Sequence, residues 1–133
     1  MGGNNTLRIY SASIMLSLLM LMPQTSFTQE TIFTQASCTI VYSLERSADK
    51  YFNNEITQLS VQIDKKNIRF IDLNSWSKTP PHLDVSGRLR NQLRQLYGLK
   101  KDINQAVLVN NQGEMLNRYN GSVTLVNALI DCR

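Results

Sequence analysis

The chain has 133 residues, a formal net charge of +4, a hydrophobic fraction of 42% and a charged fraction of 18%. This length allows one small domain, and so high an apolar fraction with so low a net charge excludes an intrinsically disordered chain. One histidine and two cysteines exclude a disulfide-dense scaffold and a zinc site with four Cys or His ligands.

The N-terminal segment has the features of a secretory signal peptide. The stretch Ile14–Met22 is almost wholly apolar and ends at a proline. It is shorter than the ~20 apolar residues that cross a bilayer, and its length is typical of the apolar region of a signal peptide. Small residues favour cleavage after Ser26 or Thr28, while an uncleaved anchor and a buried core helix are the alternatives. We therefore predict a signal peptide over residues 1–28 and one domain over residues 29–133, periplasmic or secreted, with no stable membrane span after removal of the signal.

The first half of the domain predicts a strand, a helix and a second strand. Cys38–Leu44 is rich in β-branched and aromatic residues, which favours a central strand buried on both faces. A helix is expected after Ser47, because apolar residues follow at spacings of 4, 3 and 4, namely Phe52, Ile56, Leu59 and Ile63. Asn67–Leu73 is the second strand, parallel to the first through a right-handed crossover. The segment 74–84 contains Pro80 and Pro81 and is expected to be irregular.

The second half predicts a helix, a β-hairpin and a last helix. The helix carries a stripe of Leu89, Leu93 and Leu96 and ends at Gly98. Ala106–Val109 and Met115–Tyr119 are strands joined by a four-residue turn, so they are expected to be antiparallel neighbours. The last helix follows Ser122, with its apolar residues at Val126, Leu129 and Ile130. The element order is therefore β-α-β-α-β-β-α.

The segment from Tyr97 to Gly121 resembles part of the thioredoxin-like fold. It is similar to that family's pattern of Tyr-Gly-(Val/Leu), a strand, a (Asp/Asn)-x-x-Gly turn, a second strand and Tyr-x-Gly. Ala128–Asp131 is similar to the end of an uncharacterised thioredoxin-like domain family of exported bacterial proteins that lack a CxxC motif. The resemblance covers about residues 36–133. It implies a single α/β domain with a four-stranded mixed sheet and helices on both faces.

The resemblance also locates a corner where thioredoxin-like enzymes carry their redox cysteines. In those enzymes the cysteines follow the first strand, where a helix N-terminus lowers the pKa of a thiol. Here that place reads Ser43–Ala48 and contains no cysteine. The proline that usually precedes the third strand is also missing, because Asn104 and Gln105 stand there. These departures argue against thiol–disulfide exchange and against a peroxidatic reaction at this corner.

The two cysteines are expected at the opposite end of the domain. In the resembled topology the last helix runs antiparallel to the first strand, so Cys132 would lie near Cys38. A structural disulfide is expected if their Cα atoms approach within ~7 Å. Two separate thiols are the alternative.

Three further residues at or near the corner are candidates for a partner surface. Glu45 and Arg46 occupy the family's functional position, with an exposed helix entry as the alternative. Trp76 could anchor a partner, because tryptophan is frequent at binding hot spots, or could pack over the edge of the domain. His82 is expected to be a solvent-exposed loop residue and not a catalytic base.

The densest basic region lies in and just after the predicted third helix. Its functional interpretation is anion binding, for example to lipid headgroups or cell-wall polymers, and its alternative is a solvated helix face. Nucleic acid is not expected as a partner, because no extended basic track with interleaved aromatic residues is present. The region comprises Arg88, Arg90, Arg94, Lys100 and Lys101.

Together these features predict an exported thioredoxin-like domain without redox catalysis, acting as a binding or accessory protein of the cell envelope. No residue is assigned a catalytic, cofactor-binding or metal-binding role, and no cofactor is expected. The expected partner is an unidentified envelope protein. One alternative is a thiol-dependent oxidoreductase that uses Cys38 or Cys132, and another is a small inhibitor or immunity-type protein of the envelope.

Overall fold

The computed structural model describes residues 32–133. The predicted signal peptide and its cleavage site therefore lie outside the described residues. Within them the elements are β1 (Cys38–Ser43), α2 (Arg46–Gln58), α3 (Ser60–Lys66), β2 (Ile68–Asp72), α4 (Gly87–Tyr97), β3 (Gln105–Asn110), β4 (Met115–Asn120) and α5 (Leu125–Asp131). These elements form a single small α/β domain, as the sequence predicted.

The four strands form one mixed sheet in the order β2-β1-β3-β4. β1 is parallel to β2 and antiparallel to β3, and β3 is antiparallel to β4. Every residue of β1 is buried, which confirms that it is the central strand. The predicted hairpin is also confirmed, with a register shift between Leu108 and Val109.

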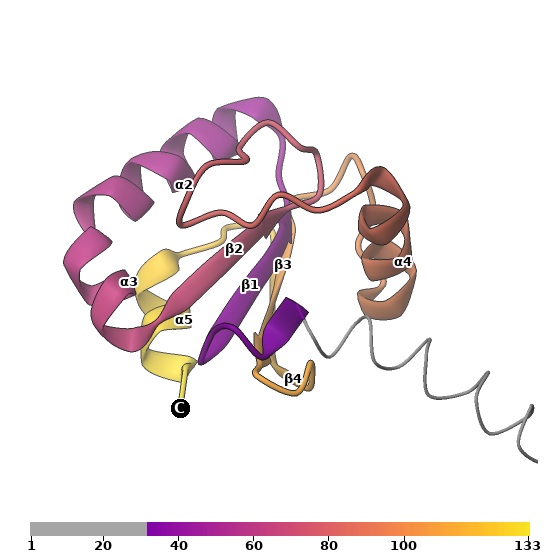
Figure 1. The fold of residues 1–133 in the computed structure, drawn as a ribbon. Coiled ribbons are helices and arrows are strands. Elements are labelled where there is room, and N and C mark those ends of the chain that lie inside the picture. The colour runs from indigo at the N-terminus through magenta and orange to yellow at the C-terminus, as the bar shows by residue number, and fades with distance from the viewer. Residues whose placement is uncertain (1–31) are drawn as a thin grey trace, which may run out of the picture. The chain divides into compact units, whose positions relative to one another are not determined.

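Helices cover both faces of the sheet, with α4 on one side and α2, α3 and α5 on the other (Figure 1). Alternate residues of a strand point to opposite faces. Ile40 and Tyr42 of β1 therefore join the cluster with Phe52 of α2 and Leu125 of α5. On the other face Ser43 accepts a hydrogen bond from α4. The central strand thus presents a large aromatic core to one layer of helices and a smaller, partly polar surface to the other.

The turn between β3 and β4 depends on a glycine. Gly113 has φ +82°, and a Cβ atom there would lie 3.0 Å from the Phe33 ring. Its N–H donates to the carbonyl of Asn110, whose side chain accepts from the backbone N–H groups of Gln112 and Glu114. Any other residue would meet both an unfavourable φ and a buried ring.

Three helix predictions need correction. The single helix expected after Ser47 is two helices, because the backbone at Leu59 leaves helical geometry (φ −103°, ψ 20°). The spacing of apolar residues could not reveal this break, since the buried stripe continues across it. In α4 the buried residues are Leu93 and Tyr97, while Leu96 is exposed.

The third correction concerns α5. Leu125, Ala128 and Leu129 are its buried residues, whereas Val126 and Ile130 are exposed. The helix also begins after Thr124 instead of Ser122.

Candidate functional site

The corner singled out by the sequence lies at the carboxyl end of β1. Ser43 of β1 pairs with Gln105 of β3, so the residue before β3 lies next to the start of α2. The backbone N–H of Glu45 donates to Asn104 Oδ1 at 2.7 Å. The side chain of Asn104 thus fixes the entry of α2, at the position where the resembled family has a proline.

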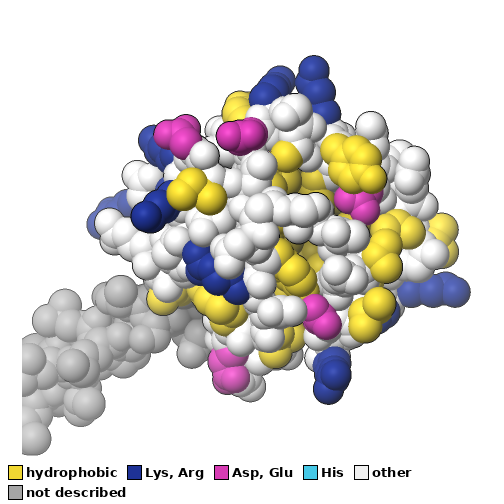
Figure 2. All heavy atoms as spheres, turned by 180° about the vertical axis from the view of Figure 1, so that it is seen from behind, with side chains coloured by type: hydrophobic (Ala, Val, Ile, Leu, Met, Phe, Trp, Pro, Cys, Tyr) yellow, Lys and Arg dark blue, Asp and Glu magenta, His cyan; other side chains and the backbone are white. Residues whose placement is uncertain are grey.

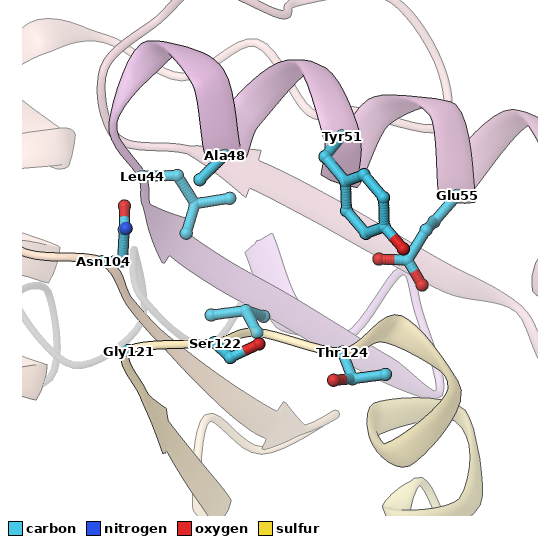
Figure 3. Close-up of a pocket in the computed structure, with 9 residues that line it drawn as sticks. Leu44, Ala48, Tyr51, Glu55, Asn104, Gly121, Ser122 and Thr124 are labelled. Atoms are coloured by element: carbon cyan, nitrogen blue, oxygen red, sulfur yellow. The ribbon is translucent and has the colours of Figure 1, made fainter.

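A pocket of about 400 Å³ opens at this corner. It is lined from four segments: the end of β1, the outer face of α2, the residue before β3, and the segment between β4 and α5 (Figure 3). Leu44, Ala48 and Val123 provide apolar surface, while Asn104, Ser122 and Thr124 provide hydrogen-bonding groups. The pocket is therefore of mixed character, with apolar and hydrogen-bonding groups from several segments facing one space.

Glu55 is the acidic side chain in the wall of this corner pocket. It projects with Tyr51 from α2 toward the segment 121–124 (Figure 3). Its Oε1 atom is inaccessible to solvent and has no hydrogen-bond partner. Burial raises the pKa of Glu55, and a backbone hydrogen bond from Leu125 acts in the opposite direction. The carboxylate therefore lacks part of the stabilisation that water or a donor would give it.

The loop after β2 is shaped by one buried carboxylate at the same end of the sheet. Asp72 Oδ1 accepts from the backbone N–H of Asn74, and its Oδ2 accepts from those of Trp76 and Ser77. Three such bonds satisfy an ionised carboxylate. They turn the chain so that Trp76 stands beside the start of α2.

The structure corrects the prediction for His82, which is only 7% exposed. The chain at Pro81–Leu83 pairs with Phe70 of β2, and this pairing carries His82 into the core. Its Nε2 atom lies 2.8 Å from the Tyr42 hydroxyl. Burial lowers the pKa of His82 and raises that of Tyr42. Both side chains are therefore neutral at neutral pH, and the hydroxyl and the imidazole share one hydrogen bond whose direction is set by the tautomer of the imidazole.

A second buried carboxylate lies close to this pair. Asp49 of α2 is only 5% exposed, and its Oδ1 has no hydrogen-bond partner. Burial, with a contribution from the Asp72 charge, raises the pKa of Asp49 to about 6. The loop after β2 lies against this part of α2, where Ser77 Oγ donates to Asn53 Oδ1.

The predicted partner-surface residues are close together in the structure. The guanidinium of Arg46 lies 4.7 Å from the centre of the Trp76 ring, in a cation–π contact. Trp76 remains 44% exposed, and Glu45 is exposed at the start of the same helix. Sequence reasoning selected these residues separately and did not foresee the contact between Arg46 and Trp76.

The predicted basic region divides into two parts. Arg94 is partly buried, and its guanidinium donates to Ser43 Oγ, the Leu73 carbonyl and Asn74 Oδ1 at distances of 2.9 to 3.2 Å. It lines a second pocket, of about 480 Å³, with Arg90 and Lys101. Arg88 and Lys100 are exposed and do not line that pocket.

The cysteines lie at the other end of the sheet. Cys38 and Cys132 form a disulfide with a Cα–Cα distance of 6.0 Å. Cys38 starts β1 and Cys132 follows α5, which is the placement that the resemblance implied. With both cysteines in one bridge, neither offers a thiol in the oxidised protein.

Hydrophobic and charged side chains are mixed on the face of the molecule seen in Figure 2. On the face seen in Figure 2, hydrophobic side chains lie in several separate groups, with Lys and Arg around the edge. Within residues 32–133, no cluster of three or more His, Cys, Asp or Glu side chains could hold a metal ion. Among the same residues, no helix has the length and hydropathy needed to cross a membrane.

Glu55, Asp49 and Asp72 are the polar residues that sequence reasoning missed. Nothing in the pattern distinguished Glu55 from other charged residues on an exposed helix face. Its environment comes from the segment 121–124, which is distant in sequence. No protein-family model matches the chain, and comparison with curated proteins gives no match either.

Proposed function

We propose that this chain is an exported thioredoxin-like binding protein of the cell envelope that holds a segment of another protein at the corner pocket. The observation that carries the proposal is the convergence of four chain segments on one pocket at the carboxyl end of β1. Ligands of open α/β sheets commonly bind at the carboxyl ends of the strands. The corner offers this surface without a cysteine between Ser43 and Ala48.

The proposed ligand group is a side chain or chain end that carries a hydrogen-bond donor, such as the ammonium of a lysine. Glu55 Oε1 lacks a donor, and the terminal bond of a glutamate rotates easily, so a small rotation presents this oxygen to the pocket. Tyr51 is 69% exposed beside it and can fold over a bound segment. Leu44 and Val123 would contact the apolar part of the same side chain.

Photocross-linking in the native cells tests this proposal. A photoreactive amino acid replaces Tyr51 in one variant and Val61 of α3 in the other, since both positions are exposed to a similar degree, 69% and 63%. We expect one dominant protein adduct from position 51 and none of the same mass from position 61. Equal labelling from both positions, or none from position 51, would contradict the corner as the binding surface.

A second comparison isolates the carboxylate of the pocket. Glu55→Gln preserves size and removes the charge, and Glu114→Gln makes the same change at an exposed residue of the β3–β4 turn. Both changes are made in the chain that carries the photoreactive residue at position 51. We expect the first change to reduce the adduct several-fold and the second to leave it unchanged. Export itself is tested by N-terminal sequencing of the purified protein, which should begin after Ser26 or Thr28.

A further inference from the structure

The pocket between α4 and the loop after β2 holds an excess of positive charge. Arg90 and Arg94 line it from α4, and Lys101 lines it from the segment before β3. Within the described residues no carboxylate lies within ion-pair distance of these three side chains. The hydrogen bonds of the Arg94 guanidinium all go to neutral oxygens. Three cations therefore share one pocket without a direct counterion.

The nearest carboxylates cannot neutralise this pocket by direct contact. Asp72 and Asp102 act on Arg94 only through the longer-range electrostatic field. Both oxygens of Asp72 are already bonded to backbone N–H groups of its own loop. Partial burial is the main reason that the pKa of Arg94 is lowered, with attraction to Asp72 acting against it and repulsion from Arg90 adding to it.

Arg94 is also rigidly placed, unlike an ordinary surface arginine. Its bonds to Ser43, Leu73 and Asn74 join it to the ends of β1 and β2. Arg90 Nη1 donates to the Val85 carbonyl at 2.6 Å, and Gly87 has no side chain that would crowd the Arg90 guanidinium. A preorganised guanidinium loses little entropy on binding an oxyanion.

From this arrangement we infer that the pocket lined by Arg90, Arg94 and Lys101 binds a phosphate group. Three converging cations match the charge and the several oxygens of a phosphate ester better than the two oxygens of a carboxylate. Asn91 lines the same pocket and its amide can supply a neutral donor, whereas the Asn74 amide is already bonded to the Leu44 carbonyl and to Arg94. Trp76 adds a flat apolar wall for the group that carries the phosphate. This site is separate from the corner pocket and does not depend on the function proposed for it.

Titration calorimetry of the full chain tests the inference with three probes at constant ionic strength, set with chloride. The probes are inorganic phosphate, glycerol phosphate, and vesicles of phosphatidylglycerol compared with vesicles of phosphatidylcholine. Saturable binding of inorganic phosphate or glycerol phosphate would show that the pocket binds a free phosphate group. Binding of phosphatidylglycerol vesicles alone identifies a lipid headgroup.

Variants decide whether any such binding uses this pocket. Arg90→Gln removes one hydrogen bond to the Val85 carbonyl, whereas Lys101→Gln changes a side chain that makes no hydrogen bond or ion pair within the described residues. Arg88→Gln is the matched control on α4, because Arg88 is exposed and outside the pocket. Loss of one charge-assisted hydrogen bond is expected to weaken binding roughly five- to tenfold in the first two variants and less than about twofold in the control. Equal weakening in all three variants, or no saturable binding of any probe, would overturn the inference.

Discussion

The two ends of the central strand differ in how their chemical groups are satisfied. At its start, Cys38 is covalently joined to Cys132, and Lys66 of α3 donates to the Leu129 carbonyl of α5 at 2.6 Å. Toward its other end lie two carboxylate oxygens without partners, on Asp49 and Glu55, and the guanidinium of Arg94. Within residues 32–133, the buried group without a partner beside the disulfide is the neutral hydroxyl of Thr39. The protein thus concentrates its covalent stabilisation at one end and its incompletely paired charges at the other.

This contrast explains how a small domain tolerates incompletely paired charges. Each buried group that lacks a partner costs free energy of unfolding. A disulfide that closes a separation of 94 residues adds stability at the opposite end of β1. Substitutions at each end of β1, and in two contacts near its carboxyl end, test this contrast.

The largest effect is expected at the disulfide end. Cys38→Ser should lower the free energy of unfolding by about 4 kcal/mol, the figure that the chain-entropy model gives for a loop of this length. Denaturant unfolding under non-reducing conditions measures it. The wild-type protein in reductant should match the variant, whereas an unchanged unfolding midpoint in the variant would show that the bridge adds no stability.

The next largest effect is an increase in the free energy of unfolding, expected near the carboxyl end of β1. Asp49 has a pKa of about 6 in the folded protein against an ordinary value of 3.8. Ionisation of Asp49 therefore lowers the free energy of unfolding. This loss develops as the pH rises from about 4 to about 6. Asp49→Asn should remove this loss and stabilise the protein at pH 7 by up to about 3 kcal/mol.

Thermal unfolding from pH 3.5 to 8 tests this sign. Asp64→Asn is the control, because Asp64 is exposed on α3. It should follow the wild-type curve. A variant at position 49 that is less stable than the wild type at pH 7 would show that the carboxylate has a stabilising partner.

A smaller loss is expected from Tyr42→Phe. The change removes the hydroxyl that lies 2.8 Å from His82 Nε2 and leaves that nitrogen buried without this hydrogen bond. We expect a loss of about 1–2 kcal/mol in chemical denaturation. Tyr51→Phe, at an exposed position of α2, should have no effect. Equal stability of the two variants would mean that the Tyr42–His82 bond does not stabilise the core.

The smallest effect concerns the cation–π contact at the surface. A double-mutant cycle with Arg46→Ala and Trp76→Ala should give a coupling of about 0.5 kcal/mol, because the ring is 44% exposed. Chemical denaturation of the four proteins measures it. A coupling near zero would show that the two side chains are independent in solution.

The fold was predictable because its signals are local or periodic. The β-branched run of β1 and the short turn at Gly113 each specify their element directly. The break at Leu59 and the buried face of α5 were not predictable, because helical spacing records which residues are apolar and not where a helix bends or begins. Burial of Tyr97 in place of Leu96 has the same origin, since adjacent positions differ by 100° around a helix.

The candidate site was predictable only in part. The corner and the residues Glu45 and Arg46 were selected through the resemblance to the thioredoxin-like fold, and Trp76 was selected from its loop position. The polar environment of Asp49, Glu55 and His82 arises from segments that are far apart in sequence, such as β2 and the loop that follows it. A single sequence carries no signal for contacts of this kind.

Hydrogen–deuterium exchange on the complex isolated by cross-linking at position 51 tests the central claim most directly. The account predicts new protection in residues 43–46 and 121–124, at the carboxyl end of β1, with unchanged exchange around Cys38 and Cys132. New protection confined to the disulfide end would contradict it, because the partner would then contact the end of the sheet away from the corner pocket.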